Sequence, residues 1–312
     1  MAAARLGGPV PDGGYAALSE RAMERFRARM RERDAMPQRA KAAVDGVAHA
    51  LRPGSMDAAI PPRHLLFLDL EGPRPLAAVA VGELDAADLV TWQLSGVGIA
   101  PETAMWGTVR EAGQLLLEQR VVGVGSPAVV AWLGYPAPTL AHAVLDLRAR
   151  AAAERFSHEL QRFARWRPDG PRTAVEAHSY GATVAAHGLA ALAAERASGT
   201  VSCLATTGSA GMPRRLAADP SLLGVPAHRV FEAVAADDAL ARLGRRLSGR
   251  TRPAGRVFDV DGRPGLGLLP VTGHNTSRFV PGAGRPRYGY RDPGTLSLRN
   301  LALVTAGLEP LA

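Results

Sequence analysis

The apolar residues of the chain follow two kinds of pattern, and the change comes near residue 60. Before it, Met23, Phe26 and Met30 recur at helical spacing among charged residues. This pattern predicts helix over about 19–52, interrupted near Pro37. After residue 60, short apolar runs alternate with longer helical stretches. The alternation predicts an α/β fold with a mostly parallel central sheet and helices on both faces.

The second part of the chain supplies the strands and helices of that sheet. Continuous apolar runs such as "PAVVAWLGY" are typical of strands that are buried on both faces. The first two strands are joined by a short Gly-Pro turn, which favours antiparallel pairing. The predicted strands cover 64–70, 75–82, 88–96, 127–135, 173–179, 201–209, 229–237, 255–261 and 266–273, and the predicted helices cover 103–120, 139–166, 180–197 and 295–308.

These patterns divide the chain into three parts. Residues 1–15 are rich in Gly and Pro, and we expect them to be disordered. Residues 16–60 are expected to form a helical extension, and residues 61–312 a single domain. Inside that domain, the segments 210–228 and 239–270 could form lids over a pocket or could be surface loops.

Composition narrows the classes of protein. With 312 residues, 47% of them hydrophobic, the chain can bury a sizeable core. No run of 18 apolar residues occurs, so we expect no membrane-spanning helix. The N-terminal residues lack an apolar leader pattern, which favours the cytoplasm. The single cysteine, Cys203, excludes an internal disulfide framework. No cluster of His, Cys and carboxylates has metal-ligand spacing, and we expect neither metal nor cofactor.

The charge of the chain is basic, with a formal net charge of +8. All of the 37 basic residues except Lys41 are arginine, which is typical of a high-GC genome and weakens the case for a nucleic-acid partner. The densest basic stretch, 19–34, has glutamates among its arginines. It fits a solvated amphipathic helix with internal ion pairs, and a contact with an acidic lipid or nucleic acid is the alternative.

Candidate chemistry is concentrated in "AVEAHSYGATVAAHGLA", residues 174–190. Ser179 ends a predicted strand and a helix begins at once, with the small residues Ala177 and Gly181 on either side. This arrangement is the nucleophile elbow, Gly-x-Ser-x-Gly, with alanine in place of the first glycine. The turn would lift the serine hydroxyl above the sheet and place the Tyr180 N–H at a helix N-terminus, where it can bind an oxyanion. An ordinary serine at a helix start is the alternative.

Such a serine needs a general base and an acid that orients the base. In folds that carry the elbow, the chain order is serine, acid, histidine. Asp237 and Asp238 lie at the end of a later predicted strand, and His274 lies in the loop before the final helix. Histidine suits the task because its pKa lies near neutrality. His178 precedes Ser179 in the strand, and we expect its side chain to point away from the serine.

The second oxyanion donor should come from the loop after the third strand. This loop reads "QLSGVGIA", and its glycines allow the backbone to approach a substrate closely. The N–H of Gly96 or Val97 is the predicted donor. A plain glycine-rich turn is the alternative.

Taken together, these motifs resemble a family of α/β-hydrolase proteins from high-GC bacteria labelled domain of unknown function 1023. The resemblance covers about 61–308, and its motifs are "RHLLFLDLEGPRPLAAVAVGELDAADLVTWQLSGVG", "AWLGYPAP", "AHSYGATV", "TTGSAGM", "LGVPAHRVFEAVAADDAL", "GHNTSRF" and "SLRNLALVTAGL". Family members usually have glycine where this chain has Ala177, and Asp-Pro-Ile where it has Asp238-Ala239-Leu240. The resemblance implies an α/β-hydrolase fold and a Ser-His-Asp hydrolase, and it favours Asp238 over Asp237.

The sequence therefore predicts a serine hydrolase that cleaves a small-molecule ester, in the class of carboxylic ester hydrolases, with thioesters and amides as further substrates. Ser179, His274 and Asp238 would form the catalytic triad, and an acyl-enzyme would be the intermediate. One alternative is acyl transfer to an alcohol on the same triad. Another is an inactive hydrolase fold that serves as a binding module. The oligomeric state is left open.

Overall fold

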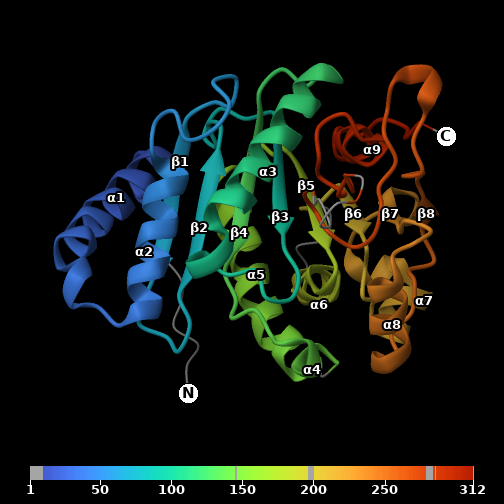
Figure 1. Ribbon diagram of the computed structural model, residues 1–312, viewed down its shortest axis with the longest axis horizontal. Helices are drawn as coiled ribbons and strands as arrows, with labels where there is room; N and C mark the ends of the chain where they lie inside the picture. The colour runs from blue at the N-terminus through green and yellow to red at the C-terminus, as the bar shows by residue number, and fades with distance from the viewer. Residues whose placement is uncertain (1–9, 145, 196–199, 279–283, 285, 312) are drawn as a thin grey trace.

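The computed structural model describes residues 10–144, 146–195, 200–278, 284 and 286–311 (Figure 1). Eight strands form one sheet in the order β1-β2-β4-β3-β5-β6-β7-β8. The pairs β1–β2 and β2–β4 are antiparallel, and all other neighbours are parallel. The strands are β1 (Arg63–Asp69), β2 (Leu76–Val81), β3 (Leu89–Leu94), β4 (Pro127–Leu133), β5 (Arg172–His178), β6 (Cys203–Thr207), β7 (Val230–Ala233) and β8 (Arg256–Val257). The predicted α/β class and the antiparallel first pair are confirmed.

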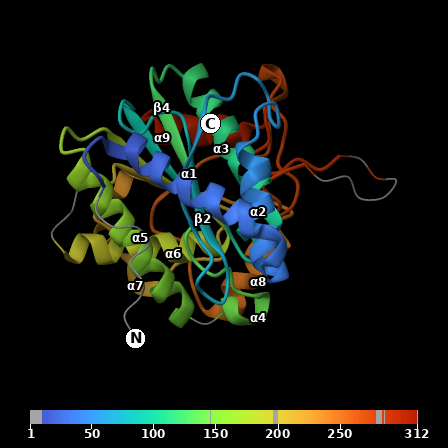
Figure 2. The same cartoon turned by 90° about the vertical axis from the view of Figure 1, so that its left-hand side faces the viewer.

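Helices cover both faces of this sheet, as the alternating pattern predicts (Figures 1 and 2). The α-helices are α1 (Gly14–Glu32), α2 (Gln38–Leu51), α3 (Pro101–Val121), α4 (Leu140–Ala143), α5 (Asp146–Trp166), α6 (Tyr180–Ala194), α7 (Arg214–Ala218), α8 (Ala239–Ser248) and α9 (Leu296–Thr305), and the 3-10 helices are η1 (Arg33–Ala35), η2 (Pro220–Leu223), η3 (Ala227–Arg229) and η4 (Pro264–Leu266).

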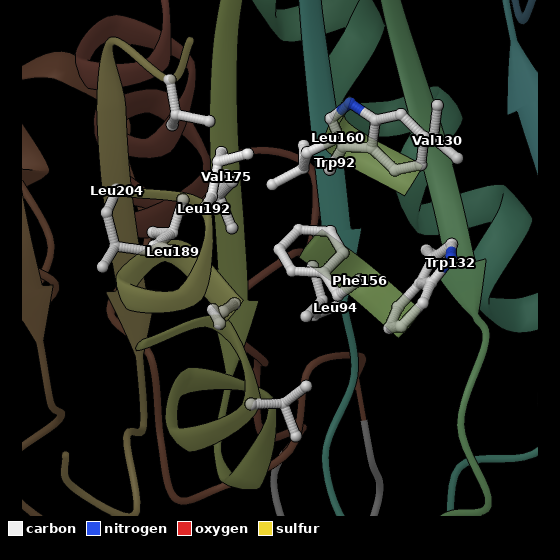
Figure 3. Packing of buried hydrophobic residues seen from close by; sticks show 14 of the residues in the cluster. Trp92, Leu94, Val130, Trp132, Phe156, Leu160, Val175, Leu189, Leu192 and Leu204 are labelled. Carbon is white, nitrogen blue, oxygen red and sulfur yellow. The ribbon is translucent and has the colours of Figure 1, made fainter. Parts of the chain in front are cut away.

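Each face of the sheet has its own apolar core. On the face covered by α5 and α6, Trp92 and Trp132 of the sheet pack on Phe156 of α5, with ring centroids 6.2 and 5.0 Å apart (Figure 3). The other core contains buried side chains of α2, α3 and α9. The strands between the two cores are buried on both sides, which is why β2 and β4 read as continuous apolar runs.

Helix α1 crosses the outer edge of the sheet at β1 (Figure 2). Tyr15 and Leu18 belong to one apolar core, whereas Ala22 and Phe26 belong to the other. The helix thus covers an edge strand that would otherwise expose unpaired backbone groups. Asp85 accepts hydrogen bonds from two backbone N–H groups of the first turn, both at 2.9 Å. Helix therefore begins at Gly14, earlier than the pattern places it, and the expected disorder of residues 1–15 is wrong for Gly14 and Tyr15, which are helical and buried. Residues 1–9 lie outside the described part of the chain.

Several elements differ from the predicted ones, among them α7 and α8, which the sequence pattern did not predict. The predicted helix over 139–166 is divided into α4 and α5. The stretch 266–273 forms no ladder strand; it has isolated bridges next to η4, because Gly262 and Gly267 adopt positive φ angles of 90° and 67° that turn the chain. Segment 210–228 packs several of its apolar side chains into the core that lies under α6. Opening of either predicted lid segment stays a prediction.

Candidate active site

Ser179 occupies a strained turn between β5 and α6. Its φ and ψ are 55° and −125°, and it is the only non-glycine residue with positive φ among those the structure describes. Such strain costs on the order of 1–3 kcal/mol and is maintained by the surrounding structure. Here the Ser179 N–H donates to Thr207 O at 3.0 Å, and Ser179 O accepts from Ala210 N at 3.2 Å. The turn is thereby held against the neighbouring strand β6.

Small residues around the serine are required by close backbone contacts. A β-carbon at position 181 would lie 2.8 Å from Ser95 O, so Gly181 alone allows α6 to begin this close to the end of β3. Ala177 is fully buried and pairs with Leu94 on one side and Thr206 on the other. The alanine that replaces the usual first glycine is thus accommodated within the sheet.

His274 lies between Ser179 and an acidic side chain. Its Nε2 is 2.9 Å from Ser179 Oγ, and its Nδ1 is 2.9 and 3.0 Å from the two carboxylate oxygens of Asp238. The imidazole is 18% exposed and the Asp238 side chain is fully buried. Three side chains separated by up to 95 residues in sequence therefore form one hydrogen-bonded chain at the carboxyl edge of the sheet.

The environment of Asp238 favours its ionised form. Burial opposes ionisation, but hydrogen bonds from His274, from the Ala241 N–H and from the Tyr290 hydroxyl lower the pKa of this carboxyl below its ordinary value. The Tyr290 hydroxyl in turn accepts from the Ala235 N–H at 2.8 Å, which fixes its proton toward Asp238. An ionised carboxylate against Nδ1 requires the proton on that nitrogen and leaves Nε2 free to accept one from Ser179.

Asp237, the alternative acid, lies elsewhere. It is exposed, and its Oδ1 accepts from the Gly273 N–H at 2.6 Å. The structure thus brings Asp238 to the imidazole, while Asp237 holds the backbone of the loop that carries His274. The two adjacent acids differ because α8 begins directly after them, and Asp238 caps its first turn through the Ala241 N–H.

The predicted oxyanion residues surround Ser179. A β-carbon at position 96 would lie 2.7 Å from Ser179 Cβ and 3.1 Å from its Oγ, so the backbone of Gly96 contacts the serine directly. Tyr180 is the first residue of α6, where N–H groups lack helical partners. Val97 lines a cavity that Ser179 also lines. The loop is held by the Tyr135 hydroxyl, which donates to Ser95 O.

Sequence reasoning missed a buried ionic group beneath this loop. Arg291 donates to Glu176 at 2.6 Å, to Glu111 at 3.0 Å and to Leu94 O at 2.9 Å. Burial disfavours the charged guanidinium, but the two carboxylates raise the pKa of Arg291 above its ordinary value. The signal in the sequence was Glu176, a charged residue in the middle of an apolar strand, which requires a buried partner.

His178 does not follow its prediction. Its ring lies 4.8 Å from the His274 ring and 5.4 Å from the Tyr290 ring, and it lines the same cavity as Ser179. The strained turn at Ser179 departs from strand geometry, so the simple alternation of side chains does not extend to the serine. Burial, followed by the proximity of His274 and Arg291, depresses the pKa of His178 well below its ordinary value.

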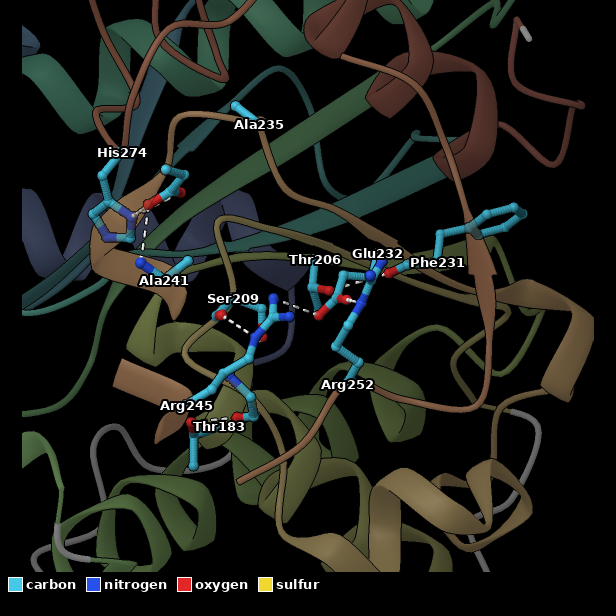
Figure 4. A network of polar contacts seen from close by, with 12 residues as sticks. Thr183, Thr206, Ser209, Phe231, Glu232, Ala235, Ala241, Arg245, Arg252 and His274 are labelled. Atoms are coloured by element: carbon cyan, nitrogen blue, oxygen red, sulfur yellow. Dashed lines mark hydrogen bonds and ion pairs between the residues drawn. The ribbon is translucent and has the colours of Figure 1, made fainter. Parts of the chain in front are cut away.

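The cavity above Ser179 has a volume of about 620 Å³. It is lined by Ser179 and His274, by the loop at 95–97, and by side chains of α3, α4 and α8. Helix α8 is fixed by Glu232 of β7, whose carboxylate binds Arg245 and Arg252 at 3.1 and 2.5 Å (Figure 4). Such a volume is typical of small-molecule sites.

The described residues contain no group of three or more His, Cys, Asp or Glu side chains placed to hold a metal ion. In the same part of the chain, every helix is too short or too polar to cross a membrane.

Comparison with known proteins agrees with this architecture. A family model described as alpha/beta hydrolase matches residues 72–248, more than half of the chain. The chain belongs to this alpha/beta hydrolase family. A search of curated proteins finds no match.

Solved structures that are similar to this chain match it at low identity and low TM-score. A dienelactone hydrolase from Anabaena variabilis is 17% identical over 63% of this chain and 84% of its own, with a TM-score of 0.38. An esterase from Pyrobaculum calidifontis is 15% identical over 70% and 81%, with a TM-score of 0.37. A ferulic acid esterase from Anaeromyces mucronatus is 9% identical over 82% and 93%, with a TM-score of 0.40.

Proposed function

We propose that this alpha/beta hydrolase is a serine esterase, a carboxylic ester hydrolase with Ser179 as nucleophile, His274 as general base and Asp238 as the orienting acid. The observation that carries the proposal is the hydrogen-bonded chain from Ser179 Oγ through His274 to Asp238. The serine at a strained strand–helix turn and the cavity above it support the same function.

The proposed reaction has two halves. Ser179 Oγ attacks the carbonyl carbon while His274 Nε2 takes the hydroxyl proton, and the negative charge that develops on the carbonyl oxygen is bound by N–H groups of Tyr180 and of Gly96 or Val97. His274 then gives the proton to the leaving alcohol, and an acyl-enzyme remains. In the second half, His274 activates a water molecule that releases the acid and restores the serine.

The triad has no role for a cofactor, and the proposed substrate is a small-molecule ester. Membership of the narrower family labelled domain of unknown function 1023 stays a prediction from the motifs. That narrower resemblance supplies no substrate.

The proposal is tested with a fluorophosphonate probe and with p-nitrophenyl butyrate. Wild-type protein should be labelled on Ser179 and should hydrolyse the ester, whereas Ser179→Ala should do neither. Equal labelling of the two proteins would contradict the proposal and would favour a binding module on a hydrolase fold. Addition of a competing alcohol, followed by product analysis, separates hydrolysis from acyl transfer.

A further inference from the structure

One wall of the Ser179 cavity consists of leucines that remain exposed. Leu240, Leu243 and Leu247 of α8 are 39%, 50% and 61% exposed and share one face of the helix. Leu140 of α4 is 62% exposed and lines the same cavity. We call these four residues the leucine wall. Because apolar surface in water is unfavourable, an apolar group that enters the cavity and covers the wall gains binding energy.

The leucine wall is held in a defined place relative to Ser179. Arg250 follows α8, is nearly fully buried, and donates to Ala143 O at 2.9 Å and to Val144 O at 3.5 Å at the end of α4. Its guanidinium also lies 5.6 Å from the centre of the Tyr180 ring, next to the nucleophile. One side chain therefore links α4, α8 and the serine turn.

Other elements give the cavity a polar lining. Thr276 and Ser277 line it and directly follow the loop residues His274 and Asn275. Both hydroxyls donate to Glu111 Oε1, Thr276 at 2.7 Å. Since its proton is used in this way, Thr276 Oγ1 presents lone pairs and can accept a hydrogen bond from a substrate. Ser277 Oγ already accepts from Arg110 Nη2 at 3.4 Å and keeps one further lone pair.

The two linings assign the two ends of an ester. His274 takes the Ser179 proton and must deliver it to the leaving alcohol oxygen, so the alcohol leaves beside His274. Thr276 and Ser277, which come shortly after His274 in the chain, give this part of the cavity its polar lining. The acyl end is then left for the leucine wall. From Leu240 to Leu247 the wall runs about 10 Å, at about 1.5 Å per residue.

We propose that this cavity selects esters whose acyl group is an alkyl chain long enough to lie along the leucine wall. The inference rests on the proposed esterase function. In the acylation step the bond between Ser179 Oγ and the acyl carbon forms, and the bond between that carbon and the alcohol oxygen breaks. The proton passes from Oγ through His274 to the leaving oxygen, and the alkyl chain stays covalently bound on the wall.

The test uses two isomeric esters, ethyl octanoate and octyl acetate. They contain the same atoms, but the long chain lies on the acyl side in the first and on the alcohol side in the second. Wild-type protein should hydrolyse ethyl octanoate with a kcat/KM at least about tenfold higher, because burial of two methylenes alone is worth roughly that factor. Acid release at constant pH measures both esters without a chromophore.

Leu243→Ser should reduce this preference for ethyl octanoate severalfold. The matched control is Leu266→Ser, which changes a leucine of similar exposure (58%) on η4, outside the cavity lining, and should keep the wild-type ratio. Equal or faster hydrolysis of octyl acetate would overturn the inference, as would an unchanged ratio in Leu243→Ser. If wild-type protein hydrolyses neither ester faster than Ser179→Ala does, the proposed esterase function is wrong. If hydrolysis depends on Ser179 but the two esters have equal kcat/KM values, only the proposed selection of long acyl chains is wrong.

Discussion

Arg291 Nη2 lies 2.6 Å from Oε2 of Glu176, a buried residue of β5 three positions before Ser179. The same guanidinium nitrogen donates to Leu94 O at the end of β3, where the predicted oxyanion loop begins. A buried ion pair of this kind contributes little net stability, yet it becomes costly when one partner is lost. Here it connects β5, the strand that leads to Ser179, to the loop that contacts the serine.

Substitution of Arg291 should therefore affect folding strongly. Arg291→Met leaves Glu176 and Glu111 buried without a counterion, and we expect a loss of about 3–5 kcal/mol in the free energy of unfolding, measured by urea denaturation. The double variant Arg291→Met with Glu176→Met should recover part of the loss, because it removes an uncompensated charge. A single variant as stable as wild type would contradict the assigned role of this pair.

Gly96 should be irreplaceable for activity. A β-carbon there would lie 2.7 Å from Ser179 Cβ, so Gly96→Ala must displace either the serine or the loop that carries the predicted oxyanion donors. Loss of one such donor lowers kcat by about a hundredfold or more. Gly265→Ala is the control, since a β-carbon at that position has no heavy atom within 4 Å. Equal kcat values for p-nitrophenyl butyrate in both variants would refute the close contact.

The two neighbouring acids should behave differently. Asp238→Asn keeps the size of the side chain but lets it donate to His274 Nδ1, so the imidazole would be held with its proton on the wrong nitrogen; we expect kcat to fall roughly a thousandfold or more. Asp237→Asn retains the oxygen that accepts from the Gly273 N–H, and activity should remain close to wild type. The opposite order of the two kcat values would show that Asp237 is the acid.

His178 should make the folded state sensitive to acid. Its pKa is depressed in the folded protein from an ordinary value of 6.5, first by burial, so below pH 6.5 the unfolded chain binds a proton that the native state does not. Wild-type stability should fall as the pH drops from about 6.5 toward the folded pKa. In His178→Asn this contribution is absent, and the difference in Tm between the two proteins should change over that pH range. Parallel curves of Tm against pH would contradict the prediction.

The sequence by itself determined the alternation of most strands and helices of the sheet and the position of the serine turn. Those features depend on local rules: apolar periodicity, and the small residues that a tight strand–helix turn demands at Ala177 and Gly181. The chain order of Ser179, Asp238 and His274 was also readable, because a parallel sheet brings the carboxyl ends of its strands to one edge.

The motif resemblance favoured Asp238 over Asp237, but only the tertiary structure supplies the physical reason, which is how α8 begins after Asp238. It also decided the pairing of Arg291 with Glu176, which are 115 residues apart, and the contact of the His178 and His274 rings. The position of the leucine wall was also determined only by the tertiary structure. The spacing of Leu240, Leu243 and Leu247 predicts an apolar helix face, but a sequence pattern cannot say whether that face meets a core or a cavity. Such contacts depend on the packing of distant elements, which leaves no local pattern in the chain.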